Sequence, residues 1–215
     1  SSFLNTVALR LSFKGMYTIH KRKVLPNNRH IIKLKFIAYS NQENDLFSDL
    51  SVLDNLMIYN CVSKVKIMQL LKIFHLTDKK SKFINQLSGG ERQRVSIIKS
   101  MVKDKKILIL DEPTNGLDPS GIHEIRNLIK SLPDLYDCTV LISSHMLSEI
   151  ELMADDIGIL NHGHLLFEGS LNELRQNALQ SGFAADNKTG AANLEDLFLS
   201  MIDKDNAHRK QRAML

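Results

Sequence analysis

The pattern of apolar and polar positions along this chain predicts strands and helices in alternation. Residues 107–110 are continuously apolar and residues 139–143 nearly so, which is typical of strands buried on both faces of a parallel sheet. A helical period covers about Ile122 to Leu132 between them, and a further helix is predicted over 146–153. Strands separated by helices predict a mostly parallel sheet with flanking helices, an α/β fold.

Two other stretches depart from this alternation. Between Val52 and Phe74 the apolar positions follow a helical period, so we expect helices there. Towards the N-terminus the pattern predicts a helix over 1–10 and short strands near 16–19 and 31–38. Towards the C-terminus it predicts a hairpin of 157–160 and 164–168, a polar linker over 180–192, a short helix near 194–202 and a frayed tail over 203–215.

The composition is that of a globular protein rather than of a membrane-spanning one. With 43% hydrophobic and 24% charged residues, the chain is ordinary for a globular protein. No apolar run approaches the roughly 20 residues that cross a bilayer, so a membrane role is expected to come through a partner. The formal charge of +4 and the sparse aromatic residues favour solvated basic faces over a nucleic-acid surface. Cys61 and Cys138 lack metal-ligand spacing and are expected to be buried thiols.

The run Leu87 to Arg94, which contains Ser88-Gly89-Gly90-Glu91, precedes a helix and suits an anion. Glycines leave backbone N–H groups open to close approach, the serine adds a hydroxyl, and the helix dipole favours negative charge at that end. The alternative is a capping box, because S-x-x-E before a helix caps it without any ligand.

Two acids follow the strand at 107–110. Asp111 and Glu112 are placed at the carboxyl end of that strand, where open α/β sheets bind their ligands. One carboxylate suits a magnesium shell and a second suits a general base, although a buried strand ending in two acids also occurs for structural reasons.

Three further residues carry weaker signals. Asp118 before Pro119 is either a helix N-cap, a site residue or both. His145 follows the strand at 139–143 and is either a capping or surface residue or a phosphate donor. Gln42 is a single glutamine whose only support is its place in the order of motifs.

Taken in order, these motifs resemble those of ATP-binding-cassette (ABC) ATPases, with Glu91 where many members have Gln. The runs 111–119, 143–145 and 158–171 look most like ATP-binding subunits of bacterial ABC-2 type exporters, which include multidrug and bacteriocin resistance proteins. The resemblance implies a P-loop NTPase-like sheet with an inserted helical subdomain at about 46–102. The implied organisation is an ATPase domain over 1–175, a linker over 176–192 and a C-terminal helix and tail over 193–215.

The resemblance also implies roles for the site residues. Glu112 is the expected general base, with His145 at the terminal phosphate and Gln42 near magnesium and the attacking water. Asp111 is the expected magnesium carboxylate, while Ser88, Gly89, Gly90 and Asp118 are expected at the nucleotide interface.

The motif G-x-x-x-x-G-K-[ST] does not occur in the 215 residues. Ser1 and Ser2 resemble the residues that follow such a phosphate loop, so we expect a domain cut at its front edge. Ser1 is then an expected magnesium ligand and Ser2 an expected phosphate contact, the alternative being that Ser1 is an ordinary helix cap. Alone, this fragment is expected to bind ATP poorly and to hydrolyse almost none.

The implied assembly is a head-to-tail dimer, with homodimerisation favoured, that binds Mg-ATP and drives export through a membrane-spanning permease on a separate chain. Its place is peripheral, on the cytoplasmic face of the membrane, with no nucleic-acid partner. One alternative is a degenerate, non-hydrolysing cassette that regulates a partner. Another is a soluble relative of DNA repair, chromosome structure or translation, but residues 42–87 leave no room for a long coiled coil and only one signature is present.

Overall fold

The computed structural model describes residues 18–19, 22–23, 25, 35–40, 46–58, 63–102, 105–180 and 194–213. The chain divides into two compact units, Ser1–Ser144 and His145–Leu215. The predicted helix over 1–10 and nearly all of the predicted linker lie outside the described residues.

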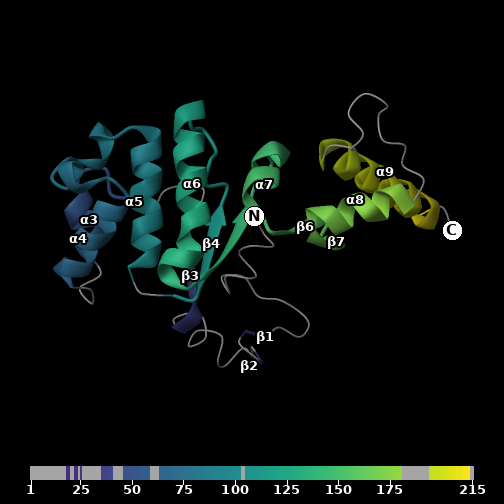
Figure 1. Ribbon diagram of the computed structural model, residues 1–215, viewed down its shortest axis with the longest axis horizontal. Helices are drawn as coiled ribbons and strands as arrows, with labels where there is room; N and C mark the ends of the chain where they lie inside the picture. Colours follow the sequence, from purple (N-terminus) through teal and green to yellow (C-terminus); the bar gives the residue numbers. More distant parts are fainter. Residues whose placement is uncertain are drawn as a thin grey trace. The chain divides into compact units, whose positions relative to one another are not determined.

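The first unit contains a parallel sheet (Figure 1). Its strands are β3 (Ile37–Ser40), β4 (Ile107–Asp111) and β5 (Thr139–Ser143), with β4 in the middle. The register pairs Ser40 with Leu110 and Asp111 with Ser143, so the carboxyl ends of the three strands meet at one edge. The expected buried parallel strand is confirmed, because Leu108, Ile109 and Leu110 are almost fully buried. A separate antiparallel pair joins β1 (Thr18–Ile19) to β2 (Arg22–Lys23).

One predicted strand begins later than expected. The pattern predicted a strand over 31–38, but Lys35 and Phe36 are helical and β3 starts at Ile37. The register between the strands accounts for this start, because Ile37 pairs with Ile107, the first residue of β4.

Helices cover the sheet and extend beyond it. They are α3 (Val52–Met57), α4 (Lys64–Ile73), α5 (Gly89–Met101) and α6 (Pro119–Tyr136), with short 3₁₀ turns η1 (Thr77–Lys79) and η2 (Ile84–Gln86). α5 packs against β3 and beside α6, α3 packs on α5, and α4 packs on α3 (Figure 1). The side chains buried among these helices include Leu56, Ile67, Leu70, Leu71, Phe74, Leu76, Ile97 and Ile98. This core fixes the start of α5, which carries the Ser-Gly-Gly run.

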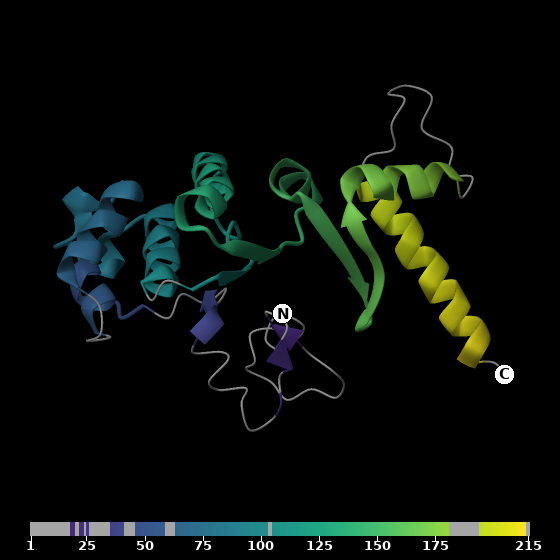
Figure 2. The ribbon, with the colours of Figure 1, turned by 60° about the horizontal axis from the view of Figure 1, so that its bottom comes forward.

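The second unit is a hairpin packed with helices (Figure 2). It consists of α7 (Leu147–Met153), β6 (Asp156–Asn161), β7 (His164–Ser170), α8 (Leu171–Gln180) and α9 (Leu194–Ala213). The hairpin closes through His162 and Gly163, whose φ angles of 46° and 78° suit the mirror-image turn that tight hairpins prefer. Ile157, Ile159, Leu174, Leu194 and Leu197 form its core.

The C-terminal prediction was wrong in one respect. The tail expected to fray from residue 203 is helical to Ala213 as part of α9. One tertiary and one local bond explain the difference. The Asp205 carboxylate accepts a hydrogen bond from the Asn161 amide of β6 at 2.9 Å and pairs with Arg209, one turn further along α9, at 2.7 Å. The domain boundary expected at residue 175 falls inside α8.

Candidate nucleotide site

The carboxyl edge of the β3–β4–β5 sheet holds the two acids singled out in the sequence. Asp111 ends β4 and is only 4% exposed, and Glu112 follows it half-buried. The Glu112 backbone N–H donates to the Ser143 carbonyl at 3.2 Å and to the Ser143 hydroxyl at 3.1 Å. Glu112 has a φ of 51°, a left-handed conformation that a non-glycine residue adopts at some cost in free energy. The backbone at this acid is therefore strained and held by β5.

Neutral hydroxyl groups hold the Asp111 carboxylate. The Tyr39 hydroxyl donates to one oxygen at 2.9 Å and the Ser143 hydroxyl to the other at 2.6 Å. Both of these donors are neutral hydroxyl groups. A carboxylate of this kind suits Mg²⁺, which binds through few carboxylates together with phosphate oxygens and water. The described residues hold no cluster of three or more His, Cys, Asp or Glu side chains, so an all-protein metal cage is absent from that part of the chain.

Ser88 is the N-cap of α5, and the capping box expected as the alternative is present. The Ser88 hydroxyl accepts from the Glu91 backbone N–H at 3.2 Å, and the Glu91 carboxylate accepts from the Ser88 backbone N–H at 2.9 Å. Lys79 pairs with the same carboxylate at 3.2 Å. The pKa of the Glu91 carboxyl is lowered, chiefly by the hydrogen bond from Ser88, with Lys79 adding to the effect. The role that the sequence left open for Glu91 is thus a helix cap.

Capping does not exclude a ligand at this end of α5. An accepting serine hydroxyl keeps its own proton for donation, and Ser88 is exposed. A side chain added at Gly90 would meet only the Gly121 Cα at 3.7 Å, an ordinary contact, whereas one at Gly89 would lie 3.3 Å from the Leu117 Cδ2. A side chain at Gly89 would therefore be tight against Leu117, while Gly90 leaves space beside the helix start.

The segment that follows Glu112, up to the start of α6, contacts α5. Asp118 is the N-cap of α6 and accepts from the Gly121 N–H at 3.3 Å, which agrees with the capping interpretation of its sequence. The Gly89 Cα faces Leu117, and Arg94 of α5 pairs with Glu124 of α6 at 2.7 Å. The Ser-Gly-Gly run and the Asp118 segment therefore lie side by side within one chain.

The structure does not test the positions of the remaining predicted site residues against the acids. Ser1, Ser2 and Gln42 are outside the described residues. His145 is exposed and is the first residue of the second unit. Sequence reasoning missed the part played by Tyr39 and Ser143, and the only signal available was a polar side chain near the end of each apolar strand.

Comparison with known proteins decides the family. The family model for ABC transporters matches residues 1–115, more than half of the chain. The chain therefore belongs to the ABC transporter family. Among its relatives is the bacitracin transport ATP-binding protein BcrA of Enterococcus faecalis, 39% identical over 158 residues, which are 71% of this chain and 51% of the relative. The chain thus spans about half the length of this ABC protein.

Two further similarities agree with this membership. The lantibiotic transport ATP-binding protein SrtF of Streptococcus pyogenes is 37% identical over 172 residues, 79% of this chain and 67% of the relative. A solved dimeric ATP-binding cassette in a post-hydrolysis state, bound to ADP and Pi, superposes with a TM-score of 0.67 at 24% identity over 79% of each chain. The predicted α/β cassette fold is thereby confirmed.

Proposed function

We propose that this chain is the nucleotide-binding part of a transporter ATPase that binds and hydrolyses Mg-ATP. The observation that carries the proposal is the pair of acids at the end of β4, with Asp111 buried and held by two neutral hydroxyls. Asp111 would bind the magnesium shell, and Glu112 would accept a proton from the attacking water. Magnesium would neutralise charge on the phosphates when bound. By resemblance, Ser1 and Gln42 would join the metal site, Ser2 the phosphates, and His145 the terminal phosphate.

The proposed working unit is a head-to-tail pair of cassettes, most simply two copies. Ser88, Gly90 and Asp118 of one copy would then complete the nucleotide site that contains Asp111 and Glu112 of the other. The exposed start of α5 supports this, because its dipole and amide groups favour an anion that approaches from outside the chain. The dimeric state of the similar solved cassette also supports it.

Removal of the metal tests the enzymatic part of the proposal. ATP hydrolysis by the protein as its native host produces it should require Mg²⁺ and should stop when EDTA is added in excess, because phosphoryl transfer needs the cation. Release of inorganic phosphate is the measurement. ATP binding with no turnover would contradict the proposal and favour the degenerate, regulatory cassette.

We also propose that the cassette drives export through a membrane-spanning partner on a separate chain and works peripherally at the cytoplasmic face of the membrane. No helix in the described part of the chain has the length and apolar character needed to cross a bilayer. The names of the bacitracin and lantibiotic relatives describe them as transport ATP-binding proteins. These names support a partner that carries the transport path.

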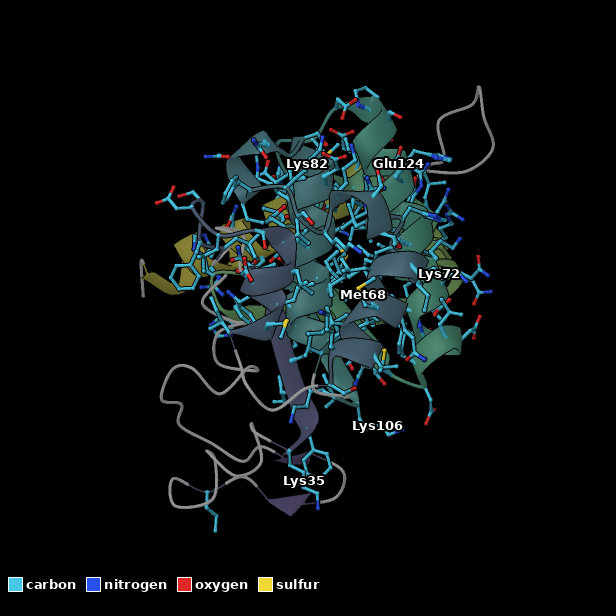
Figure 3. The ribbon with its side chains drawn as sticks, turned by 90° about the vertical axis from the view of Figure 1, so that its left-hand side faces the viewer. Lys35, Met68, Lys72, Lys82, Lys106 and Glu124 are labelled. Atoms are coloured by element: carbon cyan, nitrogen blue, oxygen red, sulfur yellow. The ribbon has the colours of Figure 1, made fainter. Side chains whose placement is uncertain are left out.

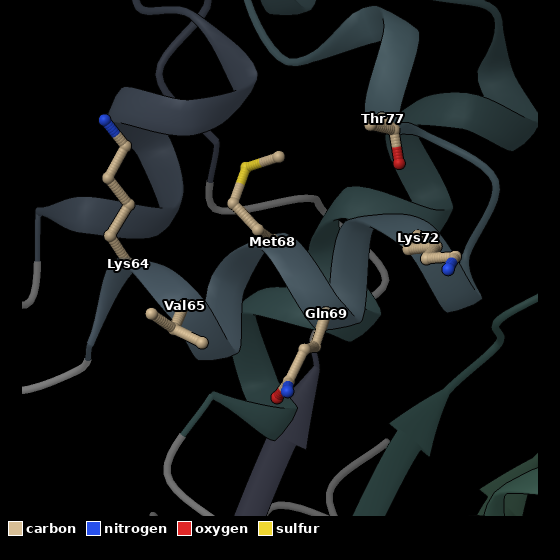
Figure 4. A pocket seen from close by; sticks show the side chains of 6 residues that line it. All are labelled: Lys64, Val65, Met68, Gln69, Lys72 and Thr77. Carbon is tan, nitrogen blue, oxygen red and sulfur yellow. The ribbon is translucent and has the colours of Figure 1, made fainter.

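A groove on the outer face of α4 is the proposed contact for that partner (Figure 4). Its volume is about 670 Å³, and its lining consists almost entirely of apolar atoms from Lys64, Val65, Met68, Gln69, Lys72 and Thr77. Val65 is 68% exposed, a large apolar surface to leave in water. Met68 and Lys72 lie on the same face of the first unit (Figure 3). Apolar side chains with acidic neighbours, on a segment of the membrane partner, would fit the groove between Lys64 and Lys72.

Substitution of Val65 tests the groove. In the complete transporter, Val65→Glu should reduce substrate transport by about tenfold, since it places a charge in the apolar contact, while ATP binding by the cassette stays unchanged. Leu135→Glu is the matched control, because Leu135 is 55% exposed and belongs to α6 rather than to the groove. Equal transport by the two variants would exclude this groove as the docking surface.

A further inference from the structure

The Asp111 carboxylate is held from both sides by neighbouring strands. β4 lies between β3 and β5, so the Tyr39 hydroxyl reaches the Asp111 Oδ2 from one side at 2.9 Å. The Ser143 hydroxyl reaches the Oδ1 from the other side at 2.6 Å. Each carboxylate oxygen therefore has a donor from a different strand.

Two donors on opposite oxygens fix the plane of a carboxylate. A buried aspartate can otherwise rotate about its terminal torsion, which is broad and roughly twofold. Hydrogen bonds to a charged group are stronger than those between neutral groups, so two of them favour one orientation strongly.

We propose that Tyr39 is a positioning residue for the metal: its hydroxyl fixes the orientation of the Asp111 carboxylate, the expected ligand of the cation that accompanies the nucleotide. This inference rests on the proposed function, since it takes Asp111 to be the magnesium carboxylate. Tyr39 itself does not touch the cation. Its effect passes through Asp111, as the partners behind metal ligands generally act.

Metal affinity measured by spectroscopy tests this role. Mn²⁺ replaces Mg²⁺, a non-hydrolysable ATP analogue is the nucleotide, and electron paramagnetic resonance reports free Mn²⁺ in the presence of the protein as its native host makes it. We expect Tyr39→Phe to weaken Mn²⁺ binding by about tenfold, the low end of what the loss of such partners costs. The ring that fills the space stays, so the fold should persist.

The matched control is Tyr136→Phe. Tyr136 ends α6 near the start of β5, at the opposite end of the strands from Asp111, and it is likewise half-buried. The Tyr136→Phe protein should bind Mn²⁺ as tightly as the wild type.

The kcat of Tyr39→Phe at saturating Mg²⁺ should change less than twofold, because a higher metal concentration restores occupancy of the site. A purely structural role for Tyr39 would not lower the metal affinity while leaving kcat unchanged. Ser143→Ala removes the other donor and should weaken Mn²⁺ binding as well, which keeps the test decisive if Tyr39→Phe unfolds.

The outcomes separate the two levels of the proposal. Wild-type protein that fails to bind Mn²⁺ with the nucleotide would overturn the proposed function, and the positioning role with it. Wild-type protein that binds Mn²⁺, with unchanged affinity in folded Tyr39→Phe, would overturn the positioning role alone; if Tyr39→Phe unfolds, unchanged affinity in Ser143→Ala would overturn it.

Discussion

In the protein as its native host makes it, Glu112→Gln should lower ATP hydrolysis at least about 100-fold while ATP binding stays near the wild-type level, because removal of a general base typically costs two to four powers of ten in rate. Glutamine has the shape of glutamate but cannot take a proton from water at neutral pH. The bonds that hold this position come from the Glu112 backbone N–H to Ser143, so the substitution leaves them in place. Phosphate release and binding of labelled ATP are the two measurements.

Glu168→Gln is the control for this substitution. Glu168 is an exposed glutamate of β7 in the second unit, and its replacement makes the same chemical change without touching the acids of β4. It should retain wild-type turnover. If Glu112→Gln also retained turnover within twofold, Glu112 would not be the base.

Gly90→Asp should also abolish hydrolysis, by at least about 100-fold, because a carboxylate at the start of α5 would repel the phosphates expected there. The fold should tolerate the substitution. A Cβ at Gly90 meets only the Gly121 Cα, at 3.7 Å, and an acid in the first turn of a helix is favourable. Thermal unfolding together with phosphate release measures both parts of this expectation.

Gly90→Ala separates charge from bulk. Alanine adds the same Cβ without the charge, so it should keep most of the activity. Loss of activity in both variants would indicate that close backbone approach matters more than charge. Full activity in Gly90→Asp would exclude the start of α5 as a phosphate site.

The sequence predicted those elements whose apolar pattern reflects burial. β4 is continuously apolar because its side chains are covered on both faces, and β5 begins and ends at the predicted residues. The end of α9 was mispredicted because the polar residues beyond 202 are held by partners distant in sequence, such as the Asn161–Asp205 bond across 44 residues. The local pattern of apolar and polar residues does not reveal contacts between residues so far apart in the sequence.

The sequence predicted candidate site residues where motifs stand in order along the chain. Asp111, Glu112 and the Ser-Gly-Gly run were singled out in this way, and their roles in binding and hydrolysis stay predictions. Tyr39 was not, because its link to Asp111 spans 72 residues and depends on the register between β3 and β4. The double role of Glu91, as a cap and as the partner of Lys79, likewise required the packing of η1 against the start of α5.

A nucleotide site shared between two copies predicts that the two inactive variants, Glu112→Gln and Gly90→Asp, restore activity when they are mixed. In a dimer of Glu112→Gln with Gly90→Asp, a head-to-tail arrangement places both substitutions in one site and leaves the other intact. Equal mixing should therefore restore about one quarter of the wild-type hydrolysis rate, because half of the dimers are mixed and each has one working site. If the mixture is as inactive as each variant alone, the acids of β4 and the start of α5 do not act across two copies, and the account is contradicted.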